Sequence, residues 1–328
     1  MLLEAVIIIL KVLAIYLALL TAVAYSTYFE RKVVARIQHR IGPNVTGPFG
    51  LLQPIADAVK MIMKEEIKPA LASRFYYLAA PVLSFVTASM AIAVIPVGDW
   101  INIGGQRIQL IISDLSIGIL YILAVTSLGV YGIVLAGWSS NSKYSLLGGL
   151  RATAQMISYE VSLGLGLIGV LLLSQTFSIA EIVRQQSGSI FNWYIFKQPV
   201  AFFVYFISAM AETNRNPFDL PEAESELVAG YHTEYAGMSF GVFFLAEYAN
   251  MITVSAIAAS MFLGGWNGPI LPPVIWFVIK VILFMFIYIW VRGTLPRFRY
   301  DQLMRFGWLV LFPIGILNIM ITAFIQVL

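Results

Sequence analysis

The chain has 328 residues, of which 60% are hydrophobic and only 11% are charged, about half the charged share of an average soluble domain or less. A soluble fold of this size could not bury so much apolar surface, so the composition excludes a soluble protein and indicates an integral membrane protein. The sequence contains no cysteine, which excludes disulfides, thiolate zinc sites and cysteine-ligated iron–sulfur clusters from this chain. Its formal net charge of +3 is small, and we expect neither a metal site nor nucleic-acid binding.

Eight apolar stretches predict membrane-spanning helices, each of which needs about 20 residues. The first stretch carries Glu4 and Lys11 and continues for a full span, so we interpret it as a membrane helix rather than a cleaved signal peptide. The fifth stretch is the shortest, and its helix could begin as early as Asn192. The expected spans are residues 5–28, 75–96, 115–138, 152–173, 199–211, 238–263, 273–291 and 306–328.

Basic residues are distributed unevenly among the connections between these spans. The odd-numbered connections carry 15 of the 20 Lys and Arg residues, and the even-numbered ones carry only Arg107, Arg184 and Lys197. The positive-inside rule therefore places the odd connections in the cytoplasm. Because the number of spans is even, both termini are expected on the non-cytoplasmic side.

The first cytoplasmic connection contains an amphipathic segment over residues 49–64. Leu51, Ile55 and Val59 recur at helical spacing, opposite Asp57 and Lys60. This pattern predicts a helix that lies at the membrane interface. From the pattern alone, a simple membrane-surface anchor explains the segment as well as a functional role does.

Several ionisable residues fall within or at the ends of the predicted membrane helices, where they are costly and usually functional. Glu160 is expected one or two turns into the fourth helix, Glu212 closes the fifth, Glu247 lies in the sixth and Lys280 in the seventh. Glu30 ends the first helix. Carboxylates on adjacent helices could form a proton path; the alternative is structural ion pairs, such as Glu247 with Lys280 or Glu160 with an arginine.

The connection between the fifth and sixth helices is unusually acidic for a cytoplasmic loop. Asp219, Glu222 and Glu226 are spaced so that a helical turn would place them on one face, where close carboxylates would couple their titrations. A solvated acidic loop is the simpler alternative. The pattern favours a proton-exchanging funnel, with the candidate residues Asp219, Glu222, Glu224, Glu226 and Glu234.

Several long segments, in order along the chain, resemble one family: the H subunit of bacterial respiratory complex I, called subunit 1 in mitochondria. The resemblance runs from the first helix to the last and includes eight spans in the same orientation. The matching segments are residues 30–32, 40–44, 50–60, 157–160, 211–237 and 295–303.

The resemblance implies a subunit of the proton-pumping NADH:quinone oxidoreductase that packs where the peripheral arm meets the membrane arm. Electrons would arrive from an iron–sulfur cluster in a neighbouring subunit, so this chain would bind no cofactor and would not be catalytic alone. Its first helix, amphipathic helix and sixth helix would admit the quinone substrate and wall its chamber. The implied quinone-binding residues are Glu30, Arg31, Arg36, Arg40 and Asp57.

The same resemblance implies that quinone reduction is coupled to proton translocation through carboxylates of this chain. The implied path runs from the acidic connection, with Asp219, Glu222, Glu224, Glu226 and Glu234, toward Glu160, Glu212 and Glu247, with Lys280 as a further candidate. Partners would be the other membrane-arm subunits, the cluster-bearing peripheral subunits, quinone and membrane lipid.

Four other functions compete with this interpretation. A membrane anchor of a related energy-converting hydrogenase or formate hydrogenlyase complex is the principal alternative. A stand-alone ion transporter, with Glu160, Glu247 and Lys280 as its ion site, is disfavoured because the polar residues concentrate in loops. A pure scaffold is disfavoured by the buried carboxylates, and haem binding by the location of His39 and His232 in connections.

The expected fold is an all-α integral membrane protein with about eight transmembrane helices and one amphipathic interfacial helix. Residues 1–328 are expected to form a single polytopic domain. The expected location is the bacterial plasma membrane.

Overall fold

The computed structural model describes residues 2–103, 106–219 and 228–328. Within these ranges, seven helical segments are long and apolar enough to cross a membrane, and α8 (Pro199–Glu212) is a shorter apolar helix. Two segments are compound: α3 runs into the 3₁₀ turn η2 (Ile92–Val94), and α12 and α13 are joined by a π-helical turn, η5 (Gly307–Leu311). The long helices are α1 (Leu2–Ile37), α3 (Arg74–Ala91), α4 (Gly118–Ser139), α5 (Lys143–Ser174), α10 (Gly237–Phe262), α11 (Pro273–Thr294), α12 (Tyr300–Phe306) and α13 (Phe312–Val327).

Short elements connect the spans. A two-stranded antiparallel hairpin, β1–β2, pairs Trp100 with Gln109 between α3 and α4. The helix α2 follows α1, and α6 and α7 precede α8. The short elements are η1 (Pro48–Gly50), α2 (Gln53–Met63), β1 (Trp100–Ile103), β2 (Gln106–Gln109), α6 (Ile179–Gln185), η3 (Ile190–Asn192), α7 (Tyr194–Lys197) and η4 (Gly230–His232).

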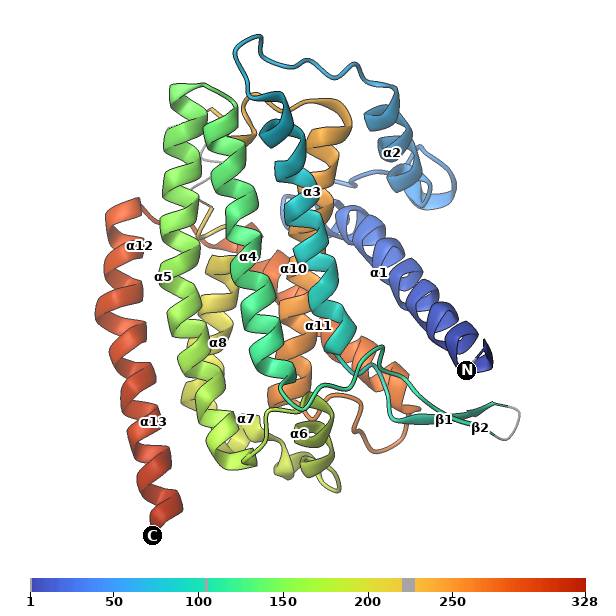
Figure 1. The fold of residues 1–328 in the computed structure, drawn as a ribbon, viewed down its shortest axis with the longest axis vertical. Coiled ribbons are helices and arrows are strands. Elements are labelled where there is room, and N and C mark those ends of the chain that lie inside the picture. Colours follow the sequence, from blue (N-terminus) through green and yellow to red (C-terminus); the bar gives the residue numbers. More distant parts are fainter. Residues whose placement is uncertain (1, 104–105, 220–227) are drawn as a thin grey trace.

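The helices form a bundle in which α10 is central. It packs against α1, α3 and α11, while α5 packs against α4, α8 and α13. Figure 1 shows α1 and α13 on opposite flanks, with α2 beyond one end of the bundle and α6, α7 and the hairpin at the other. Both chain termini lie in the half of the view that also contains α6 and α7 (Figure 1).

The sequence of α10 explains its central position. Along its second half, Ala256, Ala258 and Ala259 alternate with small hydroxyl residues such as Ser255 and Ser260, and all five are buried. Small residues let neighbouring backbones approach closely. Transmembrane helices gain van der Waals packing energy in this way, because the hydrophobic effect does not drive their association within lipid. By contrast, the outer faces of α1 and α13 carry exposed aliphatic side chains, as expected for helices in contact with lipid.

The prediction of an all-α membrane protein is confirmed, and so is the amphipathic helix, which the structure places at Gln53–Met63. The expected fifth span corresponds to α8, which begins at Pro199; the separate short helix α7 precedes it, so the helix does not extend back to Asn192.

Two predicted boundaries are wrong. The first helix continues to Ile37 rather than ending at Tyr28, and in this extension Glu30 contacts Arg292 of α11 and Arg31 pairs with Asp57 of α2. The fourth span begins at Lys143 rather than at Ala152. Glu160 therefore lies near the middle of α5, not in its first turns.

Candidate functional site

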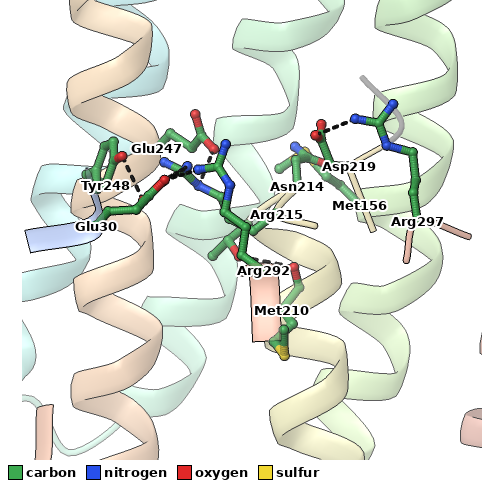
Figure 2. Close-up of polar contacts among 11 residues, drawn as sticks. Glu30, Met156, Met210, Asn214, Arg215, Asp219, Glu247, Tyr248, Arg292 and Arg297 are labelled. Atoms are coloured by element: carbon green, nitrogen blue, oxygen red, sulfur yellow. Dashed lines mark hydrogen bonds and ion pairs between the residues drawn. The ribbon is translucent and has the colours of Figure 1, made fainter. Parts of the chain in front are cut away.

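A cluster of charged side chains lies where α1, α8, α10 and α11 converge. The carboxylate of Glu30, in the last third of α1, contacts the guanidinium groups of Arg215 and Arg292. Tyr248 on α10 donates a hydrogen bond of 2.8 Å from its hydroxyl to Glu30 Oε2. Figure 2 shows these side chains turned toward one another, from three helices and, for Arg215, from the segment that follows α8. We call Glu30, Arg215, Glu247 and Arg292 the charge cluster.

Arg215 is the centre of the charge cluster. Its Nε lies 2.7 Å from Glu247 Oε1 and its Nη1 lies 3.4 Å from Glu30 Oε1, so it bridges two carboxylates from α1 and α10. Its guanidinium carbon lies 4.3 Å from the centre of the Tyr248 ring, in cation–π range. The Arg215 side chain is only 5% exposed. Two cations and two anions thus balance in a buried setting, where an unbalanced charge would be costly.

The segment that carries Arg215 is fixed from both sides. The buried amide of Gln155 on α5 donates to the carbonyl oxygens of Ala211, at 2.8 Å, and Phe218, at 2.7 Å. Arg297 Nη2 contacts Asp219 Oδ2 at 2.9 Å (Figure 2). The residues after α8 are therefore held between α5 and the α11–α12 connection, and this holds Arg215 toward the charge cluster.

A small cavity of about 60 Å³, which we call the polar cavity, adjoins the charge cluster. Glu212, at the C-terminal end of α8, and Glu247 both line it, and beside apolar side chains several hydroxyl and amide groups line it. These include Thr87 of α3, Thr126 of α4 and Asn250 of α10. A cavity lined by such groups can hold water, because each water molecule would find several hydrogen-bond partners.

Glu160 lies in the contact between α4 and α5. Its carboxylate accepts a hydrogen bond from the hydroxyl of Ser127 on α4. Glu160 and Glu212 are close enough to interact electrostatically. The alternative of an ion pair between Glu160 and an arginine is wrong for the described residues, since a serine hydroxyl takes that place.

Lys280 lies apart from the carboxylates. Its ammonium group donates to the carbonyl oxygens of Leu263, Gly265 and Asn267 at 2.6–2.8 Å, all in the turn that follows α10. It also lies 4.2 Å from the centre of the Trp193 ring. The alternative of a pair between Glu247 and Lys280 is wrong, because Glu247 pairs with Arg215. The Lys280 ammonium group, which comes from α11, instead lies at the C-terminal end of α10, where the helix dipole favours a cation.

The predicted quinone-binding residues divide into two groups. Arg31 and Asp57 form an ion pair of 2.6 Å that ties α1 to α2, and Gln53 donates to the same carboxylate at 2.9 Å. Arg36 and Arg40 are exposed near the end of α1. Glu30, by contrast, is buried in the charge cluster.

The acidic connection is described only at its two ends. Asp219 is paired with Arg297, and Glu234 lies beside η4, where its backbone carbonyl accepts a 2.7 Å hydrogen bond from the hydroxyl of Tyr77. The predicted stacking of Asp219 with Glu222 and Glu226 falls, together with Glu224, outside the described residues.

An aromatic core surrounds His232 beside this connection. Tyr231, Phe240 and Phe243 contact the imidazole ring, with Phe243 at 5.3 Å between ring centres. Burial lowers the pKa of His232 to about 3, so the ring is neutral near neutral pH. His232 therefore contributes no charge to the site in this pH range.

A second, apolar hollow opens along α1 toward the lipid. This groove has a volume of about 790 Å³, and its lining is almost entirely apolar. Alanines of α1 form one wall and α11 forms the other, with Ile252 and Ala256 of α10 between them. Tyr28 and Phe29, which line the groove, directly precede Glu30 of the charge cluster in sequence. The apolar groove and the charge cluster thus involve neighbouring residues of α1, although no residue of the cluster lines the groove.

Sequence reasoning missed three members of this arrangement: Arg215, Arg292 and Tyr248. Arg215 was counted only as a loop cation, yet it is the single basic residue within a strongly acidic connection, which was a usable signal. Ser127 was also missed, since one hydroxyl in an apolar helix carries no pattern.

Fold and site together define a multi-pass, all-α membrane protein that holds balanced ionised side chains and a polar cavity inside its bundle. The sequence model of the NADH dehydrogenase family matches residues 10–323. The chain is 58% identical to NADH-quinone oxidoreductase H subunit 2 of Koribacter versatilis, with 95% of each chain covered. It is 55% identical to the NADH-quinone oxidoreductase H subunit of Thermomicrobium roseum, covering 94% of this chain and 92% of that one. The chain belongs to the NADH dehydrogenase family.

Proposed function

We propose that this chain is the membrane subunit of a respiratory NADH:quinone oxidoreductase that admits quinone from the bilayer and couples its reduction to proton translocation. The observation that carries the proposal is an apolar groove along α1 whose lining includes Tyr28 and Phe29, next in sequence to Glu30 of the buried charge cluster. The names of relatives that match almost the whole chain support the same enzyme rather than a hydrogenase anchor.

Quinone with an isoprenoid tail is apolar and must leave the bilayer sideways to reach a protein site. The groove between α1, α10 and α11 offers a wall of small and aliphatic side chains for the tail, with Tyr28 and Phe29 nearest the charges. The exposed residues Arg36 and Arg40, and the Arg31–Asp57 pair that fixes α2, would border the chamber at this end. The chain binds no cofactor in this proposal, and quinone is the substrate.

Reduction of quinone adds two electrons and two protons, so negative charge develops transiently at the headgroup. Arg215 and Arg292 would be attracted to that charge, which weakens their hold on Glu30 and Glu247. A buried carboxylate that loses its counter-charge binds a proton more tightly. Redox state in the chamber is thereby linked to proton occupancy in the bundle.

The carboxylate path would continue through the polar cavity. Glu247 and Glu212 line the cavity, and Glu160 interacts electrostatically with Glu212, so protons would pass among these three carboxylates. Asp219, Glu234 and the glutamates 222, 224 and 226 would supply protons from the cytoplasm. The participation of Lys280 stays a prediction.

The proposal also assigns a location and neighbours. The chain would form one polytopic domain in a bacterial plasma membrane, with the α2 end of the bundle in the cytoplasm and both termini outside. Cluster-bearing peripheral subunits would dock over the α2 end, and other membrane-arm subunits and lipid would cover the sides.

The test is electron transfer and proton pumping by the assembled complex in sealed membrane vesicles carrying Glu160→Gln or Glu212→Gln. We expect assembly to persist while pumping per electron falls by about tenfold or more, because a missing protonatable group interrupts the path. The exposed Glu181→Gln on α6 is the matched control and should behave as wild type. Wild-type pumping in both Glu160→Gln and Glu212→Gln would refute the carboxylate path.

A further inference from the structure

The hydroxyl of Ser127 has one proton and two acceptors. Its oxygen lies within hydrogen-bonding distance of the Glu160 carboxylate on α5, and 2.7 Å from the carbonyl oxygen of Leu123 one turn back on α4. A serine hydroxyl can donate to only one acceptor at a time, although its oxygen can accept as well. This single proton can therefore point either to the Leu123 carbonyl oxygen on α4 or to the Glu160 carboxylate on α5.

The protonation state of Glu160 determines which of the two acceptors receives the Ser127 hydroxyl proton. An ionised carboxylate can only accept, so Ser127 then donates to Glu160. A protonated Glu160 can donate its own proton to the Ser127 oxygen, and the Ser127 proton then turns to the Leu123 carbonyl. The binding of one proton to Glu160 therefore exchanges the roles of donor and acceptor in this hydrogen bond. In both protonation states, every O–H group of the two side chains donates a hydrogen bond.

Thr126 makes this reversal less costly. Its hydroxyl also bonds to the Leu123 carbonyl oxygen, at 3.1 Å. That carbonyl therefore keeps a side-chain donor when Ser127 turns away from it, since a carbonyl oxygen can accept more than one hydrogen bond. Thr126 also lines the polar cavity that contains Glu212 and Glu247.

The surroundings of Glu160 are otherwise weakly charged. Among the helices that pack against α5, α4 and α13 have no charged residue in their sequences. The α8 helix contributes Glu212 and the tyrosine Tyr205, and α10 contributes Glu247, which pairs with Arg215. In such a setting one hydrogen bond to a carboxylate is a large part of its stabilisation.

We propose that Ser127 is a positioning residue for Glu160, whose reversible hydrogen bond holds the carboxyl group in place in both of its protonation states. Glu160 could then gain and lose a proton without leaving the α4–α5 contact, which keeps it within reach of Glu212. The inference rests on the proposed role of Glu160 in proton translocation and adds the residue that makes repeated protonation possible there.

The test is an infrared pH titration of the purified complex, in which the carboxyl band of Glu160 is identified by its loss in Glu160→Gln. Ser127→Ala should change the frequency of that band and move the midpoint of its titration by about one pH unit, a tenfold change in proton affinity. Ser127→Thr keeps the hydroxyl and should restore both. Ser255→Ala is the control, since it removes a buried hydroxyl that bonds to the carbonyl of Met251 within α10.

The two proposals fail in different ways. If Ser127→Ala titrates as wild type while Glu160→Gln abolishes pumping, the inference about Ser127 is wrong and the proposed function stands. If Glu160→Gln pumps as wild type, Glu160 lies outside the path and the inference that rests on it is wrong. If Glu212→Gln also pumps as wild type, the proposed carboxylate path is wrong as well. A complex without any Glu160-dependent band would show that Glu160 never binds a proton, and this also overturns the inference. Should Ser127→Ala fail to assemble, Ser127→Cys, a weaker donor, must show a smaller shift in the same sense.

Discussion

Arg215 illustrates how one residue can hold charges from several helices at acceptable cost. Taking an ion out of water costs several kcal/mol, which is offset only when geometry and hydrogen bonding are good. Here the guanidinium contacts carboxylates from α1 and α10 and the face of Tyr248, so its charge is met on several sides. Such a group is costly to remove, because its partners stay buried.

Arg215→Met should therefore destabilise the chain by about 3–5 kcal/mol, the usual result of leaving buried carboxylates without their partner. Thermal unfolding of the purified complex and its quinone reductase rate are the measurements. Arg215→Met combined with Glu247→Gln should recover part of the stability, because it removes the carboxylate that Arg215→Met leaves uncompensated, while Glu30 keeps its contact with Arg292. Arg299→Met is the control: its side chain is 79% exposed and pairs with Asp301 at 3.5 Å, so it should change little.

His232 gives a prediction about pH. Its pKa is about 3 in the folded chain and near 6.5 when unfolded, so below about pH 6.5 the unfolded state binds a proton that the folded state does not. Its contribution to stability is therefore complete above about pH 6.5 and is lost as pH falls toward 3. His232→Phe keeps an aromatic ring and should flatten this part of the stability–pH curve, as measured by unfolding temperature. An unchanged slope would contradict the prediction.

For the helices, the sequence predicts that a helix is present better than it predicts the residues at which the helix begins and ends. Long apolar runs sufficed to place α3, α4, α10 and α11, because few other structures satisfy backbone hydrogen bonds in lipid. The extension of α1 from Tyr28 to Ile37 was not predicted, since charged residues interrupt the apolar run there, and Glu30 meets Arg215 and Arg292 from distant parts of the chain. The charge cluster itself was beyond sequence reasoning for the same reason, although Glu30 and Glu247 could be singled out individually.

Lys280 connects three parts of the fold. It lies on α11, its ammonium group donates to a carbonyl oxygen directly after the C-terminal end of α10, and the ring of Trp193, before α7, packs against that group. Lys280→Met should remove the donor for three carbonyl oxygens and lower stability by about 2–3 kcal/mol. If the role is structural, the complex that assembles should pump the wild-type number of protons per electron. A lower ratio at normal electron transfer would instead support Lys280 as part of the proton path.

The groove between α1 and α11 can be narrowed from one wall. Ala18→Phe places a ring among its lining residues and should raise the KM for a long-tailed quinone by about tenfold, equivalent to ~1.4 kcal/mol. A quinone with a very short tail should be affected less. Leu17→Phe places the same ring at the neighbouring exposed position, which does not line the groove, and serves as the control. Equal effects of both variants on both quinones would contradict a route through the groove.

For the molecule as a whole, polar function concentrates toward one end of the bundle. The charge cluster and the α1–α2 ion pair lie toward the end that carries α2, while the Lys280 ammonium group lies near α7 at the other end. This division agrees with the distribution of basic residues along the sequence, which predicts a cytoplasmic position for the α2 end. A site that meets a peripheral electron donor on that side needs its charges there.

This orientation can be tested directly because the chain contains no cysteine. Val45, between α1 and α2, is 96% exposed, and Phe191, in η3, is 77% exposed. The α1–α2 connection and the α6–α7 segment lie at opposite ends of the bundle (Figure 1). A membrane-impermeant maleimide added to sealed right-side-out vesicles should label Phe191→Cys and spare Val45→Cys, and inverted vesicles should give the reverse.

Labelling is read on this chain after it is separated from the other subunits, and detergent-solubilised complex is the control in which both cysteines must react. The reversed pattern would place the charge cluster on the outer side, away from any cytoplasmic electron donor, and would refute the proposed coupling along with the orientation. Labelling of both cysteines from one side would contradict the bundle itself, because its two ends could not then face different compartments.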